Sequence, residues 1–203
     1  MGVAMTAPHV PAGRWAALRR YAAMAAAIGG TALTVKAVVT LVTGDEPAAA
    51  FAIGFALFPF ALLGLWSLVR DVGGRAPQIG GAIAATAAVS VVLAALIRAV
   101  GGAGVEPTEE GATVMTPFIA LGGLGTFVAL VVLGVVVRRS SALPAPYTSL
   151  PLLVGVAAIP LLMIGGALEA VSERLLEIPI VLLGLGWIAL GVALWNAAPQ
   201  ETR

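Results

Sequence analysis

Six stretches of mostly apolar residues constrain this chain more than any other feature. A bilayer core about 30 Å thick is crossed by about 20 helical residues, and each stretch is close to that length. Charged residues, proline or glycine bound the stretches, which cover about 21–43, 48–69, 79–97, 117–137, 151–172 and 179–195. The sequence therefore predicts an all-α fold: a polytopic integral membrane helical bundle of six transmembrane helices, with no soluble domain.

The composition supports this prediction. Hydrophobic residues make up 60% of the 203 residues and charged residues only 10%, whereas soluble domains are about 25% charged. The first stretch is too long for the apolar region of a signal peptide, which has about 7–15 residues, and Lys36 interrupts it. We therefore expect this stretch to be a retained helix.

The distribution of basic residues predicts the orientation, because cytoplasmic loops carry an excess of Lys and Arg. An N-terminus on the cytoplasmic side leaves only Lys36, Arg98 and Arg174 toward the outside. The cytoplasmic side then holds eight arginines, namely Arg14, Arg19, Arg20, Arg70, Arg75, Arg138, Arg139 and Arg203. Six spans bring the C-terminus back to that side, so both termini are predicted to be cytoplasmic.

Aromatic residues at the predicted inner interface agree with this orientation. Tryptophan and tyrosine prefer the membrane–water interface, and Trp15, Tyr21, Trp66, Tyr147 and Trp195 all fall at the inner ends of spans. A high content of Ala, Gly, Val and Arg with a single lysine is typical of a GC-rich bacterial genome. These features predict a multi-pass protein of the bacterial cell (plasma) membrane.

Few residues are available for chemistry. The chain has no cysteine, and its only histidine, His9, precedes the first span. Asp occurs only at Asp45 and Asp71, both between spans, and no phosphate-binding glycine loop is present. A net charge of +1 without a basic run gives no attraction for nucleic acid. We therefore expect no enzyme activity, no cofactor, no metal site and no nucleic-acid partner.

Small residues at helical spacing indicate which faces pack against other helices, because small side chains let backbones approach in lipid. One such stripe in the third stretch, Ala82, Thr86, Ser90 and Ala94, continues to Arg98. A stripe in the fifth stretch leads to Glu169 and consists of Gly155, Ala158, Leu162 and Gly165. A stripe in the first stretch includes Lys36, together with Gly29, Ala32, Thr40 and Thr43. Lys36, Arg98 and Glu169 are therefore predicted to face protein.

Lys36 lies seven residues before Thr43, which places its backbone roughly 10 Å below the end of the helix. A charge at that depth is costly and demands an explanation. Three remain open: the ammonium snorkels to the outer headgroups, it pairs with Glu169 or Glu173 between helices, or it belongs to a solute site. Glu169, Glu173 and Glu177 could stack as a cation site, but Pro179 favours a turn and a solvated rim.

Two prolines lie in the middle of spans, Pro59 in the second and Pro160 in the fifth, and each predicts a kink. Gly29-Gly30 of the first span aligns loosely with Gly122-Gly123 of the fourth. Such correspondences are typical of inverted repeats in transporters, but they also arise by chance in a chain rich in glycine, alanine and valine. The alternative is a pair of ordinary kinked helices.

Two function classes follow. The first is a permease-like or substrate-binding transport component, with a charged cluster of Lys36, Arg98, Glu169 and Glu173 near the outer side. The second is a non-transporting accessory or scaffold subunit whose charged cluster is structural. A water-accessible cavity reaching Lys36 would favour transport, and a salt-bridged Lys36 in a dry bundle would favour the second class. Expected partners are the lipid bilayer, other membrane helices or a second copy of the chain.

Overall fold

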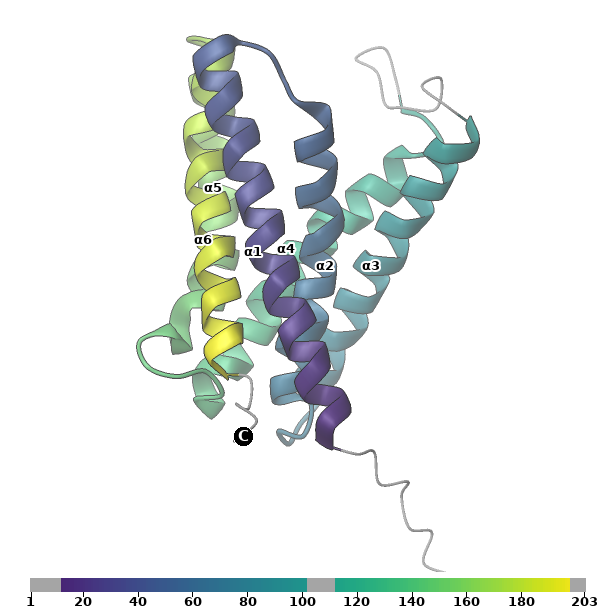
Figure 1. Cartoon of the computed structure of the whole chain (residues 1–203), viewed down its shortest axis with the longest axis vertical. Coiled ribbons are helices and arrows are strands. Elements are labelled where there is room, and N and C mark those ends of the chain that lie inside the picture. Colours follow the sequence, from purple (N-terminus) through teal and green to yellow (C-terminus); the bar gives the residue numbers. More distant parts are fainter. Residues whose placement is uncertain (1–11, 102–111, 198–203) are drawn as a thin grey trace, which may run out of the picture.

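The computed structural model describes residues 12–101 and 112–197. In this part of the chain it contains six long helices and no strand (Figure 1). The helices are α1 (Ala12–Thr43), α2 (Ala48–Val69), α3 (Ala76–Gly101), α4 (Thr116–Ser140), α5 (Leu150–Glu169) and α6 (Glu177–Ala197). All six are long and apolar enough to cross a membrane, so the predicted all-helical six-span architecture is confirmed. His9 and the predicted outer-loop acids Glu106, Glu109 and Glu110 lie outside the described residues.

The helix boundaries follow local sequence signals. α4 begins at Thr116-Pro117, where proline is tolerated because the first helical N–H groups have no partner in the helix. It ends at Ser140, because the next residue, Ser141, has a φ of 51° that stops the helix. α5 is shorter than predicted and ends at Glu169, and the short 3-10 helix η3 (Glu173–Leu176) leads into α6. Both Pro59 and Pro160 lie inside unbroken helices, and the predicted kinks stay a prediction.

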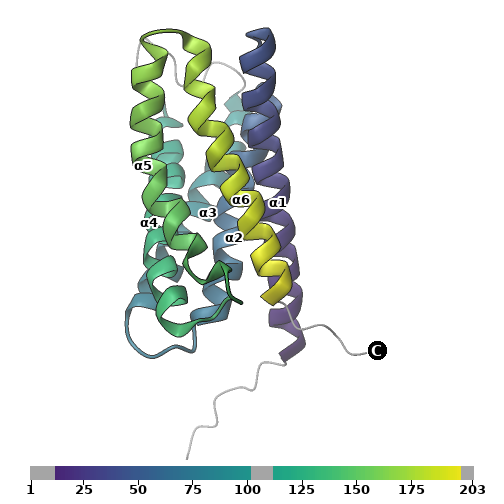
Figure 2. The same ribbon diagram turned by 90° about the vertical axis from the view of Figure 1, so that its left-hand side faces the viewer.

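Successive helices run in opposite directions, so the bundle has two distinct ends. Ala12 of α1 and Ala197 of α6 lie together at what we name the terminal end, at the bottom of Figure 1. The opposite end, named the Lys36 end, holds the α1–α2 loop and the turn between α5 and α6. Figure 2 shows α5, α6 and α1 side by side along one face.

Helix α1 packs most extensively against α6 and α2, while α4 packs most extensively against α3 and α5. Glycines allow the closest approach. A Cβ placed on Gly30 of α1 would lie 2.6 Å from the carbonyl oxygen of Gly184 and 2.8 Å from the nitrogen of Ile188, both in α6. The backbones of α1 and α6 therefore touch directly, which is the packing expected of small residues within lipid.

The small-residue stripes are confirmed in part. Gly155, Ala158 and Gly165 of α5 are buried, although Leu162 is exposed. In α3 the predicted stripe is wrong at Ala82 and Thr86, which are exposed. An α-helix turns every 3.6 residues, so a series spaced by four drifts steadily around it and leaves the packed face. Arg98, at the end of this series, is also exposed.

Aromatic residues gather at the terminal end. Arg70 lies over the ring of Trp15, with 3.6 Å between its guanidinium carbon and the ring centroid, and Trp15 meets Trp66 edge to face. Tyr21 and Trp195 are exposed at the same end. This arrangement is typical of a membrane–water interface, where rings and basic side chains meet headgroups.

We expect Gly30→Ala to destabilise the protein, because the new methyl group would collide with the backbone of α6. Overpacking of this kind costs about 1–3 kcal/mol, and thermal unfolding in detergent would measure it. Gly166→Ala of α5 is the control, since a Cβ there meets nothing within 4 Å. The control should gain up to about 1 kcal/mol from helix propensity. Equal behaviour of the two variants would contradict the close α1–α6 contact.

Candidate functional site

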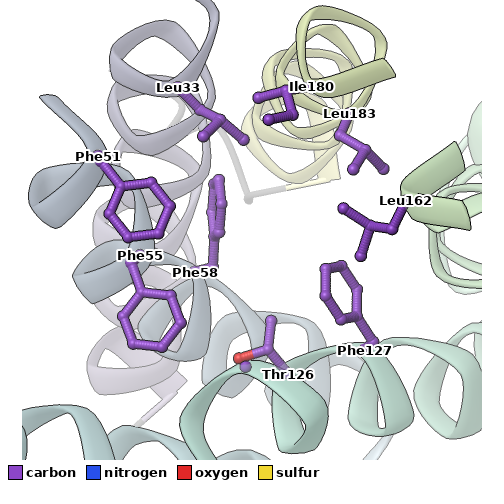
Figure 3. A pocket seen from close by; sticks show the side chains of 10 residues that line it. Leu33, Phe51, Phe55, Phe58, Thr126, Phe127, Leu162, Ile180 and Leu183 are labelled. Carbon is purple, nitrogen blue, oxygen red and sulfur yellow. The ribbon is translucent and has the colours of Figure 1, made fainter. Parts of the chain in front are cut away.

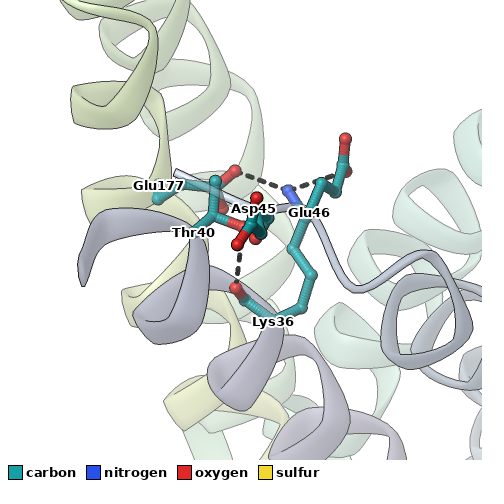
Figure 4. A network of polar contacts seen from close by, with 5 residues as sticks. All are labelled: Lys36, Thr40, Asp45, Glu46 and Glu177. Carbon is teal, nitrogen blue, oxygen red and sulfur yellow. Dashed lines mark hydrogen bonds and ion pairs between the residues drawn. The ribbon is translucent and has the colours of Figure 1, made fainter. Parts of the chain in front are cut away.

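A charged network lies at the Lys36 end of the bundle (Figure 4). Lys36 of α1 is only 4% exposed. Its Nζ donates to Oε1 of Glu177 at 2.5 Å and lies 3.0 Å from Oε1 of Glu46. Glu177 is 3% exposed, whereas the side chain of Glu46 is 61% exposed. We name these three residues the Lys36 network: one buried ammonium, one buried carboxylate and one carboxylate at the surface.

The chain path explains how these residues meet. Glu177 is the first residue of α6, and α6 runs antiparallel to α1, so it lies beside the last turns of α1. Glu46 belongs to the loop that returns from α1 to α2. Thr40 supports this loop by sharing its hydroxyl between the carbonyl oxygens of Lys36, at 3.0 Å, and Asp45, at 3.2 Å. The loop is therefore tied to the last turns of α1.

A second contact links the two connections at this end. Gly44 adopts φ of 84°, a left-handed conformation that glycine accepts without strain. Arg174, in the connection before α6, donates from Nη2 to the carbonyl oxygen of Thr43 at 3.5 Å. The α5–α6 connection thus reaches the end of α1 through the side chain of Arg174, in addition to the contact between Glu177 and Lys36.

The predicted partners of Lys36 are wrong. Glu169 and Glu173 are both exposed, and the acids that pair with Lys36 are Glu46 and Glu177. α5 ends at Glu169, and the chain must turn before α6 begins, so only Glu177 is directed against α1. Glu169 and Glu173 are exposed, as the prediction of a solvated rim requires. Glu177 is buried, so that prediction is wrong for Glu177. Snorkelling to the headgroups is not observed either, because Lys36 is buried.

Arg98 stands apart from the Lys36 network. It lies near the end of α3 and borders a cavity of about 170 Å³ between α2, α3 and α4. The other lining residues of that cavity are apolar, among them Phe51 and Phe55 of α2. The structure therefore does not bring the four predicted site residues into one cluster.

A larger apolar cavity, named here the central cavity, lies inside the bundle (Figure 3). It has a volume of about 200 Å³ and is bounded by five helices, α1, α2, α4, α5 and α6. Its lining residues are Leu33, Phe51, Phe55, Phe58, Gly123, Thr126, Phe127, Leu162, Ile180 and Leu183. Thr126 carries the only polar side chain among them, and its hydroxyl already donates to the carbonyl oxygen of Gly122 at 2.6 Å. The walls therefore suit an apolar occupant.

The central cavity lies directly below the Lys36 network. Leu33 comes one helical turn before Lys36 in α1, and Ile180 comes one turn after Glu177 in α6. Leu33 is ten residues from the end of α1, which places it roughly 15 Å below that end, a distance of about half the thickness of a bilayer core. Phe58, on the cavity wall, stacks on buried Trp187 with ring centroids 4.1 Å apart. The cavity therefore extends from within the bundle toward the charged network.

Sequence reasoning missed both the cavity and the true acids of the network. Phe51, Phe55 and Phe58 recur at helical spacing, a signal for one aromatic face on α2 that could have been read. Glu46 carried no comparable signal, because its role depends on the conformation of a four-residue loop. Within residues 12–101 and 112–197, no group of three His, Asp or Glu side chains is placed to hold a metal ion.

Comparison with known proteins gives no relative from which a function could be carried over. No family model matches the chain, and neither the curated proteins nor the solved structures contain a match.

We expect Lys36→Met to lower the free energy of unfolding by about 3–5 kcal/mol, because it leaves a buried carboxylate without its cation. Glu46→Gln should cost less than about 1 kcal/mol, since ion pairs with exposed groups contribute little. Lys36→Met/Glu177→Leu, which removes both buried charges, should recover most of the loss. Thermal unfolding of the purified variants measures the series. If Lys36→Met were as mild as Glu46→Gln, the buried pair would not be the main interaction of the network.

Proposed function

We propose that this chain is a membrane protein that binds a lipid-like molecule in its central cavity, within the bilayer. The observation that supports the proposal is the lining of the cavity, in which apolar side chains from five helices surround about 200 Å³ and the one polar side chain is already bonded. A polar solute entering this space would lose its hydration without gaining partners. An alkyl chain has no hydration to lose, because it passes from lipid to an equally apolar wall.

This proposal narrows the predicted class of permease-like or substrate-binding transport components. Lys36 is buried and paired, so it does not supply the water-accessible charge that a site for a polar solute would need. In the proposed protein the Lys36 network closes the bundle above the cavity. The binding of an apolar substrate is the proposed activity, and movement of that substrate across the membrane stays a prediction.

The second candidate is a non-transporting accessory or scaffold subunit. The observation that favours it is the buried ion pair of Lys36 and Glu177, which joins α1 to α6. Stabilising the bundle would be enough to explain this pair without a role in transport. Under this alternative, an apolar side chain of a partner helix would occupy the cavity. Purification from a mild detergent distinguishes the two candidates, because the alternative requires a stoichiometric protein partner and the first proposal requires a bound lipid.

We further propose that the terminal end faces the cytoplasm. Six arginines, Arg19, Arg20, Arg70, Arg75, Arg138 and Arg139, belong to the helix ends and loops at the terminal end. Only Lys36, Arg98 and Arg174 belong to the Lys36 end within the described residues. An excess of basic residues is typical of the cytoplasmic side.

Single cysteines test the orientation, because the chain has none of its own. Gly73→Cys lies at the terminal end, where a Cβ meets nothing within 4 Å, and Ser172→Cys lies exposed at the Lys36 end. A membrane-impermeant maleimide added to intact cells should label Ser172→Cys alone. Permeabilised cells are the control, since both variants should then react. Labelling of Gly73→Cys in intact cells would reverse the proposed orientation.

Filling the central cavity tests the proposed function. Gly123 borders the cavity, and a Cβ there meets only the ring of Phe55 at 3.5 Å and 4.0 Å, so Gly123→Leu can place its side chain in the space. Gly166→Leu is the matched control on an open face of α5. The proteins are reconstituted with a phosphatidylcholine that carries a photoreactive acyl chain. Labelling of the peptides that contain Phe55 and Phe127 should fall severalfold in Gly123→Leu and stay unchanged in Gly166→Leu. Unchanged labelling in both would contradict lipid binding in the cavity.

A further inference from the structure

The cavity that Arg98 borders opens on the side of the bundle, and we name it the Arg98 groove. It has a volume of about 170 Å³ and is lined by side chains within residues 51–56 of α2, 91–98 of α3 and 115–119 of α4. Val91 and Met115 on its floor are buried, whereas Phe51 and Ala95 on its rim are exposed. The groove therefore has apolar walls and is open at the outer surface of the bundle, where membrane helices meet lipid.

The charged part of the groove lies at one end. Among the described residues that line the groove, Arg98 alone carries a charge, and it belongs to the last turn of α3, at the Lys36 end. Its side chain is exposed. Val91 lies seven residues earlier in α3, which places it roughly 10 Å further from that end. The groove thus presents a cation at the end of a span and apolar walls along its length.

This arrangement matches a lipid in both charge and polarity. An acyl chain suits the apolar walls, and headgroups lie at the level where a spanning helix ends. A guanidinium has five N–H donors in a planar fork that fits phosphate oxygens, so Arg98 can bind a headgroup in addition to another partner. None of the described lining residues is acidic, so the cation of a choline headgroup would find no partner in the groove. An apolar helix of a partner protein would cover the walls but bring no charge to Arg98.

We infer that the Arg98 groove is a binding site for a membrane lipid with an anionic headgroup. The phosphate accepts hydrogen bonds from Arg98, and an acyl chain lies against α2, α3 and α4. The site differs from the central cavity, although Phe51 and Phe55 belong to the walls of both (Figure 3). The inference therefore goes beyond the proposed function and does not require that the central cavity be occupied.

The full-length protein is reconstituted with phosphatidylglycerol or phosphatidylcholine that carries the same photoreactive acyl chain. Mass spectrometry measures labelling of Val91 and Ala94, whose burial on the groove floor keeps lipid outside the groove away from them. Phosphatidylglycerol should label them about fivefold more than phosphatidylcholine, because one basic side chain attracts an anionic headgroup to about that extent. Arg98→Gln should abolish this preference. Arg174→Gln is the matched control and should retain it, because Arg174 is also exposed at the Lys36 end but does not line the groove.

A second pair of variants tests whether the acyl chain lies in the groove. Ala95→Leu adds bulk at the rim and should lower the labelling of Val91 by both lipids severalfold. Ala82→Leu is its control, since Ala82 is exposed on the same helix and does not line the groove. Labelling in the control should equal that of the unmodified protein.

Several results would overturn the inference. One is a preference for phosphatidylglycerol that survives Arg98→Gln or is lost equally in Arg174→Gln. Another is absence of labelling by either lipid together with a dimer that Ala95→Leu dissociates, which would show that a second copy of the chain covers the groove. If Arg98→Gln does not fold, Ala95→Leu decides, because unchanged labelling of Val91 by phosphatidylglycerol in that variant would exclude a lipid in the groove.

Discussion

One requirement determines the structure at one end of this protein: the positive charge of a lysine within the membrane must be paired with a negative charge. A charged side chain far from water needs a partner of opposite charge, and Lys36 meets this need with Glu177. That pair forms only if the last turns of α1 lie close beside the first turn of α6. The direct backbone contact at Gly30 and Gly184 provides this closeness. The ion pair and the glycine contact are therefore two parts of one interface.

The same distribution of small residues accounts for the central cavity. Glycines bring α1 against α6, and Gly80 of α3 lies close against Leu133 of α4. Within lipid there is little hydrophobic force between helices, so packing is tight only where small residues permit it. The space between the α1–α6 pair and α4 is lined instead by phenylalanine and leucine side chains, which do not interlock fully. A space of apolar walls remains between well-packed pairs of helices.

The sequence predicted the helices well and the contacts between them poorly, for physical reasons. Apolar length and bounding charges are local properties, and α2 begins and ends where the hydropathy pattern placed it. The partner of Lys36 depends on where α6 begins and on the rotation of two helices, which no local pattern reports. The stripe in α3 failed at Thr86 because a spacing of four does not match the helical repeat. The cavity requires five helices at once and had only the aromatic face of α2 as a signal.

The packing of the helices can be compared with the predicted inverted repeat. In such a repeat α1, α2 and α3 correspond to α4, α5 and α6. Helix α1 packs most extensively against α6 and α2, and α4 packs most extensively against their counterparts, α3 and α5. The aligned glycines do not follow this correspondence. A Cβ on Gly29 would lie 3.0 Å from Phe58 of α2, whose counterpart is α5, whereas a Cβ on Gly122 would lie 2.8 Å from Val91 of α3. The charges break this correspondence, because the residue aligned with Lys36 is the buried Ala129.

This asymmetry bears on mechanism. Alternating access in a transporter built from inverted repeats exchanges the conformations of two equivalent halves, so that either end can open around one site. Here a buried ion pair closes one end, and Ala129 at the aligned position of α4 cannot form an equivalent pair. Opening the Lys36 end would expose or separate Lys36 and Glu177, whereas lateral exchange with the bilayer would leave the pair intact. For the proposed lipid-binding function, we therefore expect an apolar molecule to enter between the helices, with the Lys36 network as a fixed boundary above it.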